Sequence, residues 1–293
     1  MVQKNLVTTT AKPAYSLQER ILMGGGQGTG KTYDWLTIAR ACPKQKFYII
    51  DPDDGVRSVW YPEFPELENL VYYFTPTWFT TDSETLKKGG PKSEILKDGS
   101  NRKNIFKAGV LDAWNLLKDK INPGDWVIVE HLHLIWDSVQ EAFADEVFHK
   151  DIGEYFLEKR KALVGGAKQL AALEGWVDWP VINKMHNADF INKICYQNPG
   201  HVFLTTAISV GNVNPKEDSD IKAFYGDSTI RFDGQKKTPF KARTTLIKKQ
   251  GGGRGKDRTY IANTFLKDRG REHLVDAEIT DFYYDYLVGI ASW

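Results

Sequence analysis

The sequence predicts an α/β fold in which a mainly parallel sheet is flanked by helices and followed by a basic, antiparallel C-terminal hairpin. Three observations lead to this prediction. A glycine-rich phosphate-loop pattern, Gly25–Thr32, stands between a short apolar run and a helical segment. Apolar runs alternate with helical stretches as far as residue 210. Beyond that point, two segments rich in β-branched residues flank a basic, glycine-rich stretch.

The predicted strands are short apolar runs, and the predicted helices are longer segments with apolar residues at helical spacing. The strands expected are Arg20–Met23, Phe47–Asp51, Val71–Thr75, Trp126–Glu130 and His201–Ala207. The helices expected between them are Lys31–Ala41, Val110–Ile121, Leu134–His149, Gly153–Ala172 and Trp179–Gln197. Two polar segments, Pro76–Lys103 and Gly211–Lys241, are expected to be long loops.

The C-terminal part of the chain predicts a hairpin and a closing helix. Ala242–Lys249 and Thr259–Leu266 are the expected strands of the hairpin, and Asp281–Ile290 is the expected short amphipathic helix. We expect an N-terminal extension over residues 1–17 and a single domain over 18–293. The parts expected in that domain are a core over 18–210, a basic hairpin extension over 230–275 and a terminal helix over 280–291.

Composition excludes several classes of protein. With 293 residues, of which 41% are hydrophobic and 13% aromatic, the chain can bury a sizeable core. Its two cysteines, Cys42 and Cys195, are far apart and lack a metal-ligand pattern. This argues against a disulfide framework and favours a reducing cytoplasm, that of the host if the chain is encoded by a phage. No segment has the roughly 20 apolar residues that a membrane helix needs, so no membrane partner is expected.

Each position of the phosphate-loop pattern has a physical reason. Glycines let the backbone wrap a phosphate chain where a side chain would clash, and the amides at the helix start direct partial positive charge at the anion. Lys31 is expected to reach the β- and γ-phosphates, and the Thr32 hydroxyl to bind Mg²⁺. The residues expected to bind the nucleotide, ATP with GTP as the alternative, are Gly25, Gly26, Gln27, Gly28, Thr29, Gly30, Lys31, Thr32 and Tyr33.

A single acid follows the apolar run Trp126–Val129. This residue, Glu130, stands where an acid of the metal shell is expected after a buried strand. Its carboxylate would meet Mg²⁺, in many sites through a water, because Mg²⁺ keeps several of its waters. The alternative is that Glu130 only ends a strand at the surface. We predict that Thr32 and Glu130 hold the metal.

Three carboxylates, Asp51, Asp53 and Asp54, follow the strand that should come after the phosphate-loop helix. Because ligands collect at the carboxyl ends of parallel strands, one of these acids is a candidate general base or water-orienting group. Asp-Pro-Asp-Asp-Gly is also a strong turn sequence, and the two interpretations are compatible. For the nearby His131 and His133 we expect ordinary polar contacts rather than a metal site.

This set of motifs resembles the RecA-like P-loop ATPase core, and especially the short phage ATPases of recombination and single-strand annealing. The resemblance rests on Gly25–Thr32, Ile49–Gly55, Val127–Glu130 and Lys267–Arg271. In that group an acid just past the second strand polarises the attacking water, which implies Asp53 here, with Lys31 and Glu130 completing the catalytic set. The family's polar sensor falls near Thr205 and Thr206, where the usual Gln or His is absent.

Basic residues are concentrated near the C-terminus. Residues 231–273 hold thirteen Lys or Arg against four Asp or Glu, a local charge of +9 in a chain whose net charge is +1. Such asymmetry indicates an anionic partner, and DNA, preferably single-stranded, is the one we favour. The candidate DNA contacts are Lys248, Lys249, Arg254, Lys256 and Arg258.

Two other interpretations of the basic region remain open. Lys267, Arg269 or Arg271 could act as a finger that reaches the nucleotide of a neighbouring subunit in a homo-oligomer. Alternatively, the region is a solvated hairpin whose charges keep an edge strand from pairing.

The sequence therefore favours an Mg²⁺-dependent ATPase that acts on DNA as a homo-oligomer. The alternatives are a viral DNA-packaging motor, a P-loop kinase of small molecules and a nucleotide sensor that does not hydrolyse. Packaging motors usually place two successive acids after the strand, whereas His131 follows Glu130 here. A small-molecule kinase has no evident use for the long basic hairpin.

Overall fold

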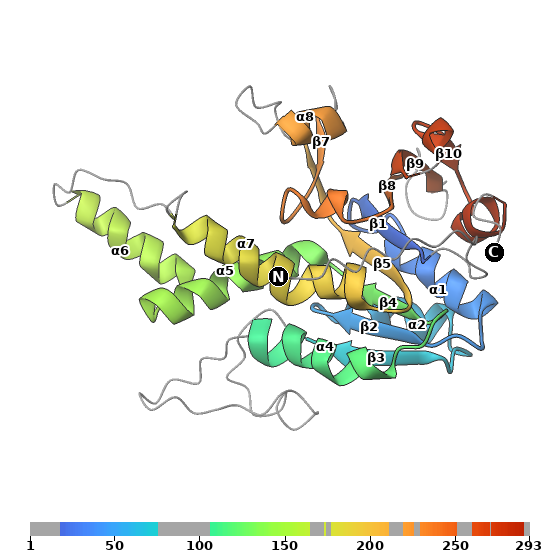
Figure 1. Ribbon diagram of the computed structural model, residues 1–293, viewed down its shortest axis with the longest axis horizontal. Coiled ribbons are helices and arrows are strands. Elements are labelled where there is room, and N and C mark those ends of the chain that lie inside the picture. The colour runs from blue at the N-terminus through green and yellow to red at the C-terminus, as the bar shows by residue number, and fades with distance from the viewer. Residues whose placement is uncertain are drawn as a thin grey trace, which may run out of the picture.

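The computed structural model describes residues 18–75, 106–164, 173, 177–210, 219–225, 229–250, 260–269 and 271–289. Its centre is an eight-stranded sheet with the strand order β10-β9-β8-β1-β5-β4-β2-β3 (Figure 1). These strands are β1 (Arg20–Gly25), β2 (Phe47–Asp51), β3 (Leu70–Phe74), β4 (Trp126–Val129), β5 (His201–Thr206), β8 (Thr244–Gln250), β9 (Tyr260–Asp268) and β10 (Glu278–Ile279). A separate two-stranded sheet holds β6 (Ile208–Val210) and β7 (Ile230–Phe232).

Six neighbouring strands, from β8 to β3, are parallel, whereas β9 and β10 pair antiparallel with their neighbours. The predicted class is therefore confirmed: the fold is α/β, with a mainly parallel sheet and antiparallel C-terminal strands. The predicted strand Phe47–Asp51 is observed as such, and the other four differ by at most two residues at an end. The hairpin is part of the main sheet rather than an extension of it, because β8 pairs directly with β1.

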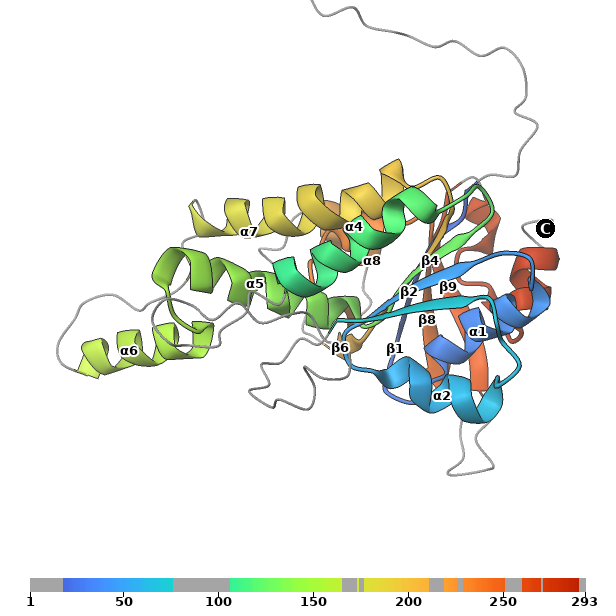
Figure 2. The same ribbon diagram turned by 90° about the horizontal axis from the view of Figure 1, so that it is seen from below.

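Helices cover both faces of the sheet (Figure 2). One face carries α1 (Lys31–Ala41), α2 (Gly55–Glu63) and the π-helical segment Phe282–Val288, and the other carries α4 (Asp112–Leu117), α5 (Leu132–Phe148) and α7 (Asp178–His186). Successive residues of β4 alternate between the two cores, with Trp126 and Ile128 in the first and Val127 and Val129 in the second. Burial on both faces explains why these strands are continuous apolar runs in the sequence.

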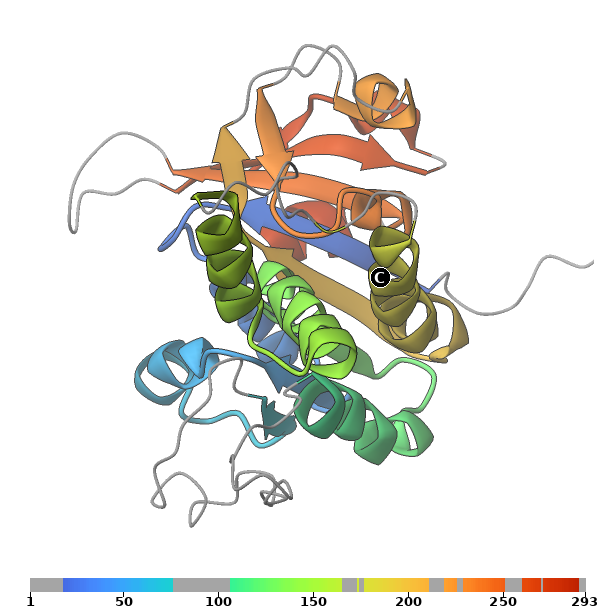
Figure 3. The ribbon, with the colours of Figure 1, turned by 90° about the vertical axis from the view of Figure 1, so that its left-hand side faces the viewer.

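A helical arm extends from the sheet on one side (Figures 1 and 3). It consists of α6 (Ile152–Val164) together with the parts of α5 and α7 that lie beyond the strands. Trp136 of α5 stacks on Trp179 of α7 with ring centres 6.1 Å apart. Phe148 stacks on Tyr155 at 4.0 Å, which joins the end of α5 to α6. Aromatic contacts therefore hold the arm together.

The observed helices are less regular than the predicted ones. The predicted helix Val110–Ile121 starts as a π-helical turn, Phe106–Leu111, and ends as a 3-10 turn, Lys118–Lys120. The predicted helix Trp179–Gln197 is α7 followed by two π-helical segments, Asn187–Ile191 and Lys193–Gln197. The closing helix is observed, also in π-helical form.

Two predicted loops have different outcomes. Gly211–Lys241 is not one long loop, because it contains α8 (Ser219–Tyr225), β7 and a 3-10 turn at Thr238–Phe240. Pro76–Lys103 lies outside the described residues, as does the end of the predicted helix Gly153–Ala172. Helix α2 was missed because its start follows a strong turn sequence.

Candidate nucleotide site

The phosphate-loop pattern lies at the carboxyl end of β1, in the interior of the parallel sheet. β1 is flanked by β5 on one side and β8 on the other. The strand ends at Gly25, and α1 begins at Lys31, so the loop connects a buried strand directly to an 11-residue helix. Ligands of open α/β sheets bind at this edge, where a helix start also directs its dipole.

Glycine is required at several positions of this loop. Gly28 and Gly30 have φ values of 72° and 85°, the left-handed region that side chains other than glycine adopt at a cost. A Cβ at Gly25 would come within 2.7 Å of Thr29 Oγ1 and 2.9 Å of the Lys248 carbonyl oxygen. A Cβ at Gly26 would meet nothing closer than 3.7 Å. The loop backbone therefore curves without side chains at its glycine positions, which leaves room for a phosphate to approach the main chain.

Lys31 lies folded against this loop. Its Nζ donates to the carbonyl oxygens of Gly25 at 2.8 Å and Gly26 at 3.0 Å. Burial lowers the pKa of Lys31, and Lys248 lowers it further, whereas Glu130 and Asp53 act in the opposite direction. A desolvated ammonium held against a glycine-rich loop at the start of a helix fits a polyanion, so the residues present fit a nucleoside triphosphate.

Two further predicted nucleotide residues border the loop. The Thr29 hydroxyl donates to the Gly26 carbonyl at 2.9 Å, which closes the loop on itself. Tyr33 is 44% exposed, and its ring meets the edge of Phe64 at 4.9 Å between centres. Tyr33 is therefore placed at the rim of the loop, where it remains available for a ligand.

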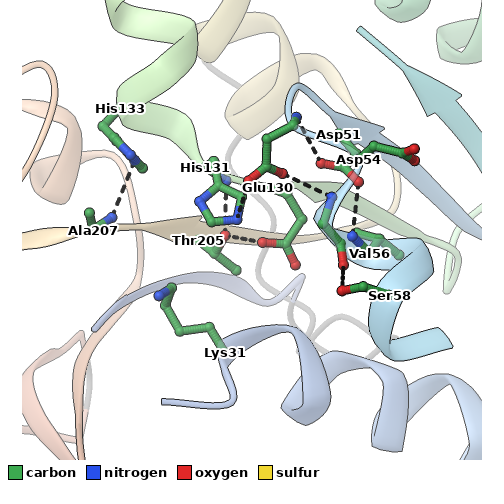
Figure 4. A network of polar contacts seen from close by, with 12 residues as sticks. Lys31, Asp51, Asp54, Val56, Ser58, Glu130, His131, His133, Thr205 and Ala207 are labelled. Atoms are coloured by element: carbon green, nitrogen blue, oxygen red, sulfur yellow. Dashed lines mark hydrogen bonds and ion pairs between the residues drawn. The ribbon is translucent and has the colours of Figure 1, made fainter. Parts of the chain in front are cut away.

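Glu130 follows β4 and is completely buried. Its Oε1 accepts a hydrogen bond from the Trp35 indole at 2.5 Å, and its Oε2 accepts one from the Thr205 hydroxyl. The interpretation of Glu130 as a surface strand end is therefore wrong. Figure 4 shows the side chain of Glu130 in contact with Thr205, with His131 and Lys31 nearby.

An Mg²⁺ ion at this site would be shared with phosphates rather than enclosed by protein ligands. Within the described residues no three His, Cys, Asp or Glu side chains group together as a metal site. Mg²⁺ commonly takes one or two protein oxygens and completes its shell with phosphate and water. The Thr32 hydroxyl at the start of α1 and the Glu130 carboxylate are oxygen groups of that kind, and their joint binding of Mg²⁺ stays a prediction, because both Glu130 oxygens accept hydrogen bonds from Trp35 and Thr205 here.

The three acids after β2 have different environments. Asp51 is buried, and its carboxylate accepts hydrogen bonds from the Val56 amide at 3.0 Å and the Tyr72 hydroxyl at 2.8 Å. Asp54 accepts from the same Tyr72 hydroxyl at 2.6 Å and lies 3.2 Å from the Arg57 guanidinium. Both of these acids are held by the start of α2 and its neighbours.

Asp53 is the acid that faces the site. Its Oδ1 accepts from the Gly55 amide at 3.1 Å, and its Oδ2 lies 3.4 Å from Nε2 of His131. Its side chain is 31% exposed, and it acts electrostatically on Lys31. Of the three acids, Asp53 is therefore the one that contacts His131 and that is also partly exposed and acts on Lys31.

The burial of Asp51 affects its pKa, and this effect can be measured. Burial, with Asp53 and Glu130 acting in the same direction, raises the pKa of Asp51 from 3.8 to about 7. Between about pH 4 and pH 7, Asp51 is therefore protonated in the folded state and ionised in the unfolded state. Asp51 contributes stability below about pH 4, and that contribution is lost as the pH rises through about 7.

We expect the stability of the wild type relative to Asp51→Asn to fall by roughly 1–4 kcal/mol between pH 4 and pH 8. Urea unfolding of both proteins across this range measures the difference. Asp119→Asn, which makes the same substitution at an exposed residue, is the control. If the difference in unfolding free energy between wild type and Asp51→Asn were the same at every pH, the raised pKa of Asp51 would be contradicted.

His131 and His133 make the polar contacts expected of them. β4 ends at Val129, and His131 adopts a left-handed conformation with φ 48° just before α5. Its ring then faces Asp53, while Nδ1 of His133 accepts from the Ala207 amide at 3.3 Å. The sequence did not indicate the pairing of His131 with Asp53, because it depends on the approach of two strand ends.

The predicted finger residues lie far from the phosphate loop of their own chain. β8 and β9 pair so that Asp268 stands opposite Thr244, at the far end of β8 from Lys248. The Lys267 ammonium donates to the carbonyls of Pro239 at 3.0 Å and Ala242 at 2.8 Å, and burial lowers the pKa of Lys267 to about 8.

Arg271 is also held within its own chain. It donates to Asp268 Oδ1 at 2.9 Å and to the Tyr286 hydroxyl at 2.7 Å. Lys267 and Arg271 are thus both engaged within their own chain, and their role as fingers toward a neighbouring subunit stays a prediction. Arg269 is exposed and donates to the Phe240 carbonyl at 3.2 Å. Of the three, only Arg269 is placed where a partner could meet it.

The predicted DNA contacts divide into three groups. Lys248 is buried and paired with Asp34, which corrects its prediction as a DNA contact because a phosphate backbone could not reach its ammonium. Lys249, the next residue, is exposed. The last three, Arg254, Lys256 and Arg258, lie outside the described residues.

No protein-family model and no curated protein matches the chain. Two solved structures are similar to it at low identity. A KaiC-like protein from the archaeon Pyrococcus horikoshii has 12% identity and a TM-score of 0.37, with 87% of this chain and 83% of that chain covered. The ATPase domain of a helicase has 12% identity and a TM-score of 0.33, with 87% and 79% covered. At these values the function must be argued from the residues themselves.

One further property concerns membranes. In the described part of the chain, every helix is too short or too polar to span a bilayer.

Proposed function

We propose that this protein binds ATP together with Mg²⁺ at the phosphate loop and hydrolyses it. The observation that carries this proposal is the glycine-bordered loop between β1 and α1, with the Lys31 ammonium lying against its carbonyls. The loop amides and the start of α1 would bind the phosphates, and Lys31 would exchange loop carbonyls for phosphate oxygens. Thr32 and Glu130 would hold the metal, which supplies charge neutralisation.

Hydrolysis requires a group that orients the attacking water, and Asp53 is our choice. Asp51 and Asp54 are both held by Tyr72, whereas Asp53 faces the loop beside His131. The carboxylate of Asp53 would accept the water proton or orient the water, and His131 would keep that carboxylate in place. Lys31 and the loop amides would stabilise the charge that develops on the transferred phosphoryl group.

We further propose that the protein acts on single-stranded DNA as a homo-oligomer, in the manner of a RecA-like recombination or annealing ATPase. The support is the +9 charge of residues 231–273 and the position of the hairpin. β8 lies next to β1, and Lys248 of β8 pairs with Gly25, where the phosphate loop begins. The next residue of β8, Lys249, is exposed. A DNA strand bound at this end of the hairpin would therefore lie close to the nucleotide.

Single-stranded DNA should accelerate ATP turnover and bind with strong salt dependence. If Lys249 neutralises one phosphate, Lys249→Met should reduce the slope of log affinity against log salt by about 0.7. Gel shifts and fluorescence anisotropy at several salt concentrations measure binding, and phosphate release measures turnover. Lys44→Met, at an exposed lysine past the end of α1, should leave the slope unchanged.

The DNA proposal fails if turnover is indifferent to added strand and no complex is retained at low salt. Stimulation only by double-stranded DNA would instead favour a translocating motor. Transfer of the γ-phosphate to a small acceptor would favour a kinase.

A further inference from the structure

β8 carries a buried lysine beside the phosphate loop. In the parallel pairing of β8 with β1, Lys248 stands opposite Gly25, the residue at which the loop begins. The side chain of Lys248 is only 7% exposed, and that of its partner Asp34 is 9% exposed. Asp34 lies in the first turn of α1, one turn beyond the loop. A strand from the C-terminal hairpin thus places a cation between the two ends of the loop.

The contacts of Lys248 reach both ends of the loop. Its Nζ lies 2.5 Å from Asp34 Oδ1 and donates to the Gly30 carbonyl at 3.3 Å. At the other end of the loop, the backbone of Lys248 lies against Gly25: a Cβ at Gly25 would come within 2.9 Å of the Lys248 carbonyl oxygen. Lys248 therefore contacts the loop at both ends, through its backbone at Gly25 and through its ammonium at Gly30. The phosphate-binding backbone curves between these two residues.

At the Gly30 end of the loop, no side chain caps the start of α1. Gly30 is the N-cap of α1, and it has φ 85°. Its conformation determines the direction of the first amides of α1, which are the groups that would face a phosphate. An ammonium that holds the Gly30 carbonyl and the first helical turn therefore controls the geometry of an anion site.

Energetics favour a positional role for this pair over a purely stabilising one. Burying two charges is costly, and an apolar pair of similar volume is often as stable or more stable. Asp34 also places a negative charge in the first turn of α1, where it would repel a phosphate if it were not neutralised. The Lys248 ammonium removes that repulsion and leaves Lys31 to act on the nucleotide.

We propose that Lys248 is a positioning residue of the nucleotide site, which neutralises Asp34 and holds Gly30 so that the loop amides keep their phosphate-binding geometry. This inference rests on the proposed binding of ATP. It assigns to the C-terminal hairpin a direct part in nucleotide binding, in addition to its proposed contact with DNA.

The test compares Lys248→Met with the double variant Lys248→Met/Asp34→Asn. Binding of a non-hydrolysable ATP analogue with Mg²⁺ is measured by calorimetry, and thermal unfolding without nucleotide measures stability. We expect Lys248→Met to weaken binding roughly tenfold or more, because it removes the cation that neutralises a buried carboxylate beside the phosphates. The double variant should recover part of this loss, since it removes that carboxylate, but not all of it, since Gly30 is still not held.

Lys44→Met is the matched control, with the same substitution at an exposed lysine, and it should bind as the wild type does. The inference is overturned if folded Lys248→Met binds as tightly as wild type. If Lys248→Met does not fold, the double variant decides, and wild-type affinity in it overturns the inference. Should the wild type itself bind no nucleotide, the proposed function fails first, and that result is distinct from either outcome.

Discussion

Replacing Lys31 with alanine should weaken ATP binding by at least about 100-fold, because two charge-assisted contacts to phosphate oxygens would be lost. In the structure the ammonium is already desolvated and directed at the loop, donating to the carbonyls of Gly25 and Gly26. Little reorganisation is therefore needed before it meets a phosphate. Calorimetry with a non-hydrolysable ATP analogue and Mg²⁺ measures the loss.

Folding should survive this substitution. Alanine is the best helix former for the first position of α1, and the change removes a cation whose pKa is lowered by burial. Thermal unfolding without nucleotide should therefore differ little between the two proteins, and Lys44→Ala serves as a control for a lost surface lysine. Unchanged affinity in folded Lys31→Ala would place the nucleotide elsewhere and remove the basis of the proposed function.

The phosphate loop could be predicted in full because its pattern encodes local geometry. Glycines at Gly28 and Gly30 permit the left-handed turns, and Lys31 starts a helix directly after them. The strands could be predicted because burial on both faces leaves a continuous apolar run, as in β4. In both cases the information lies within a few neighbouring residues.

Contacts between distant segments could not be predicted in this way. The charge of Lys248 suggested a DNA contact, yet the register of β8 against β1 turns that side chain toward Asp34. A buried indole needs an acceptor, but nothing near Trp35 in the sequence points to Glu130, which lies 95 residues away. Side-chain partners of this kind depend on strand order and register, which the sequence pattern leaves open.

The acid cluster shows the same limit within one short segment. Asp51, Asp53 and Asp54 are equivalent as a sequence motif, and only the packing of α2 and Tyr72 distinguishes them. Two of them are tied to Tyr72, and the third is left facing His131. The choice of Asp53, first implied by a resemblance, now also has support from the geometry of this chain.

Asp53→Asn should retain ATP binding within a fewfold of wild type and lose roughly 100- to 10,000-fold in turnover. Asparagine keeps the oxygen that accepts the Gly55 amide, so the start of α2 is preserved. It cannot accept the proton of an attacking water as a carboxylate does, so the loss falls on kcat rather than on affinity. Phosphate release under saturating ATP and calorimetry together separate these two effects.

Asp54→Asn is the matched control, because it makes the same change one residue away. Asp54 has φ 60°, a conformation that asparagine tolerates, and its carboxylate contacts Tyr72 and Arg57 rather than the loop. Turnover should therefore remain close to wild type. The reverse result, with Asp54→Asn inactive and Asp53→Asn active, would transfer the water-orienting role to Asp54, and it would mean that the strand end rearranges when nucleotide binds.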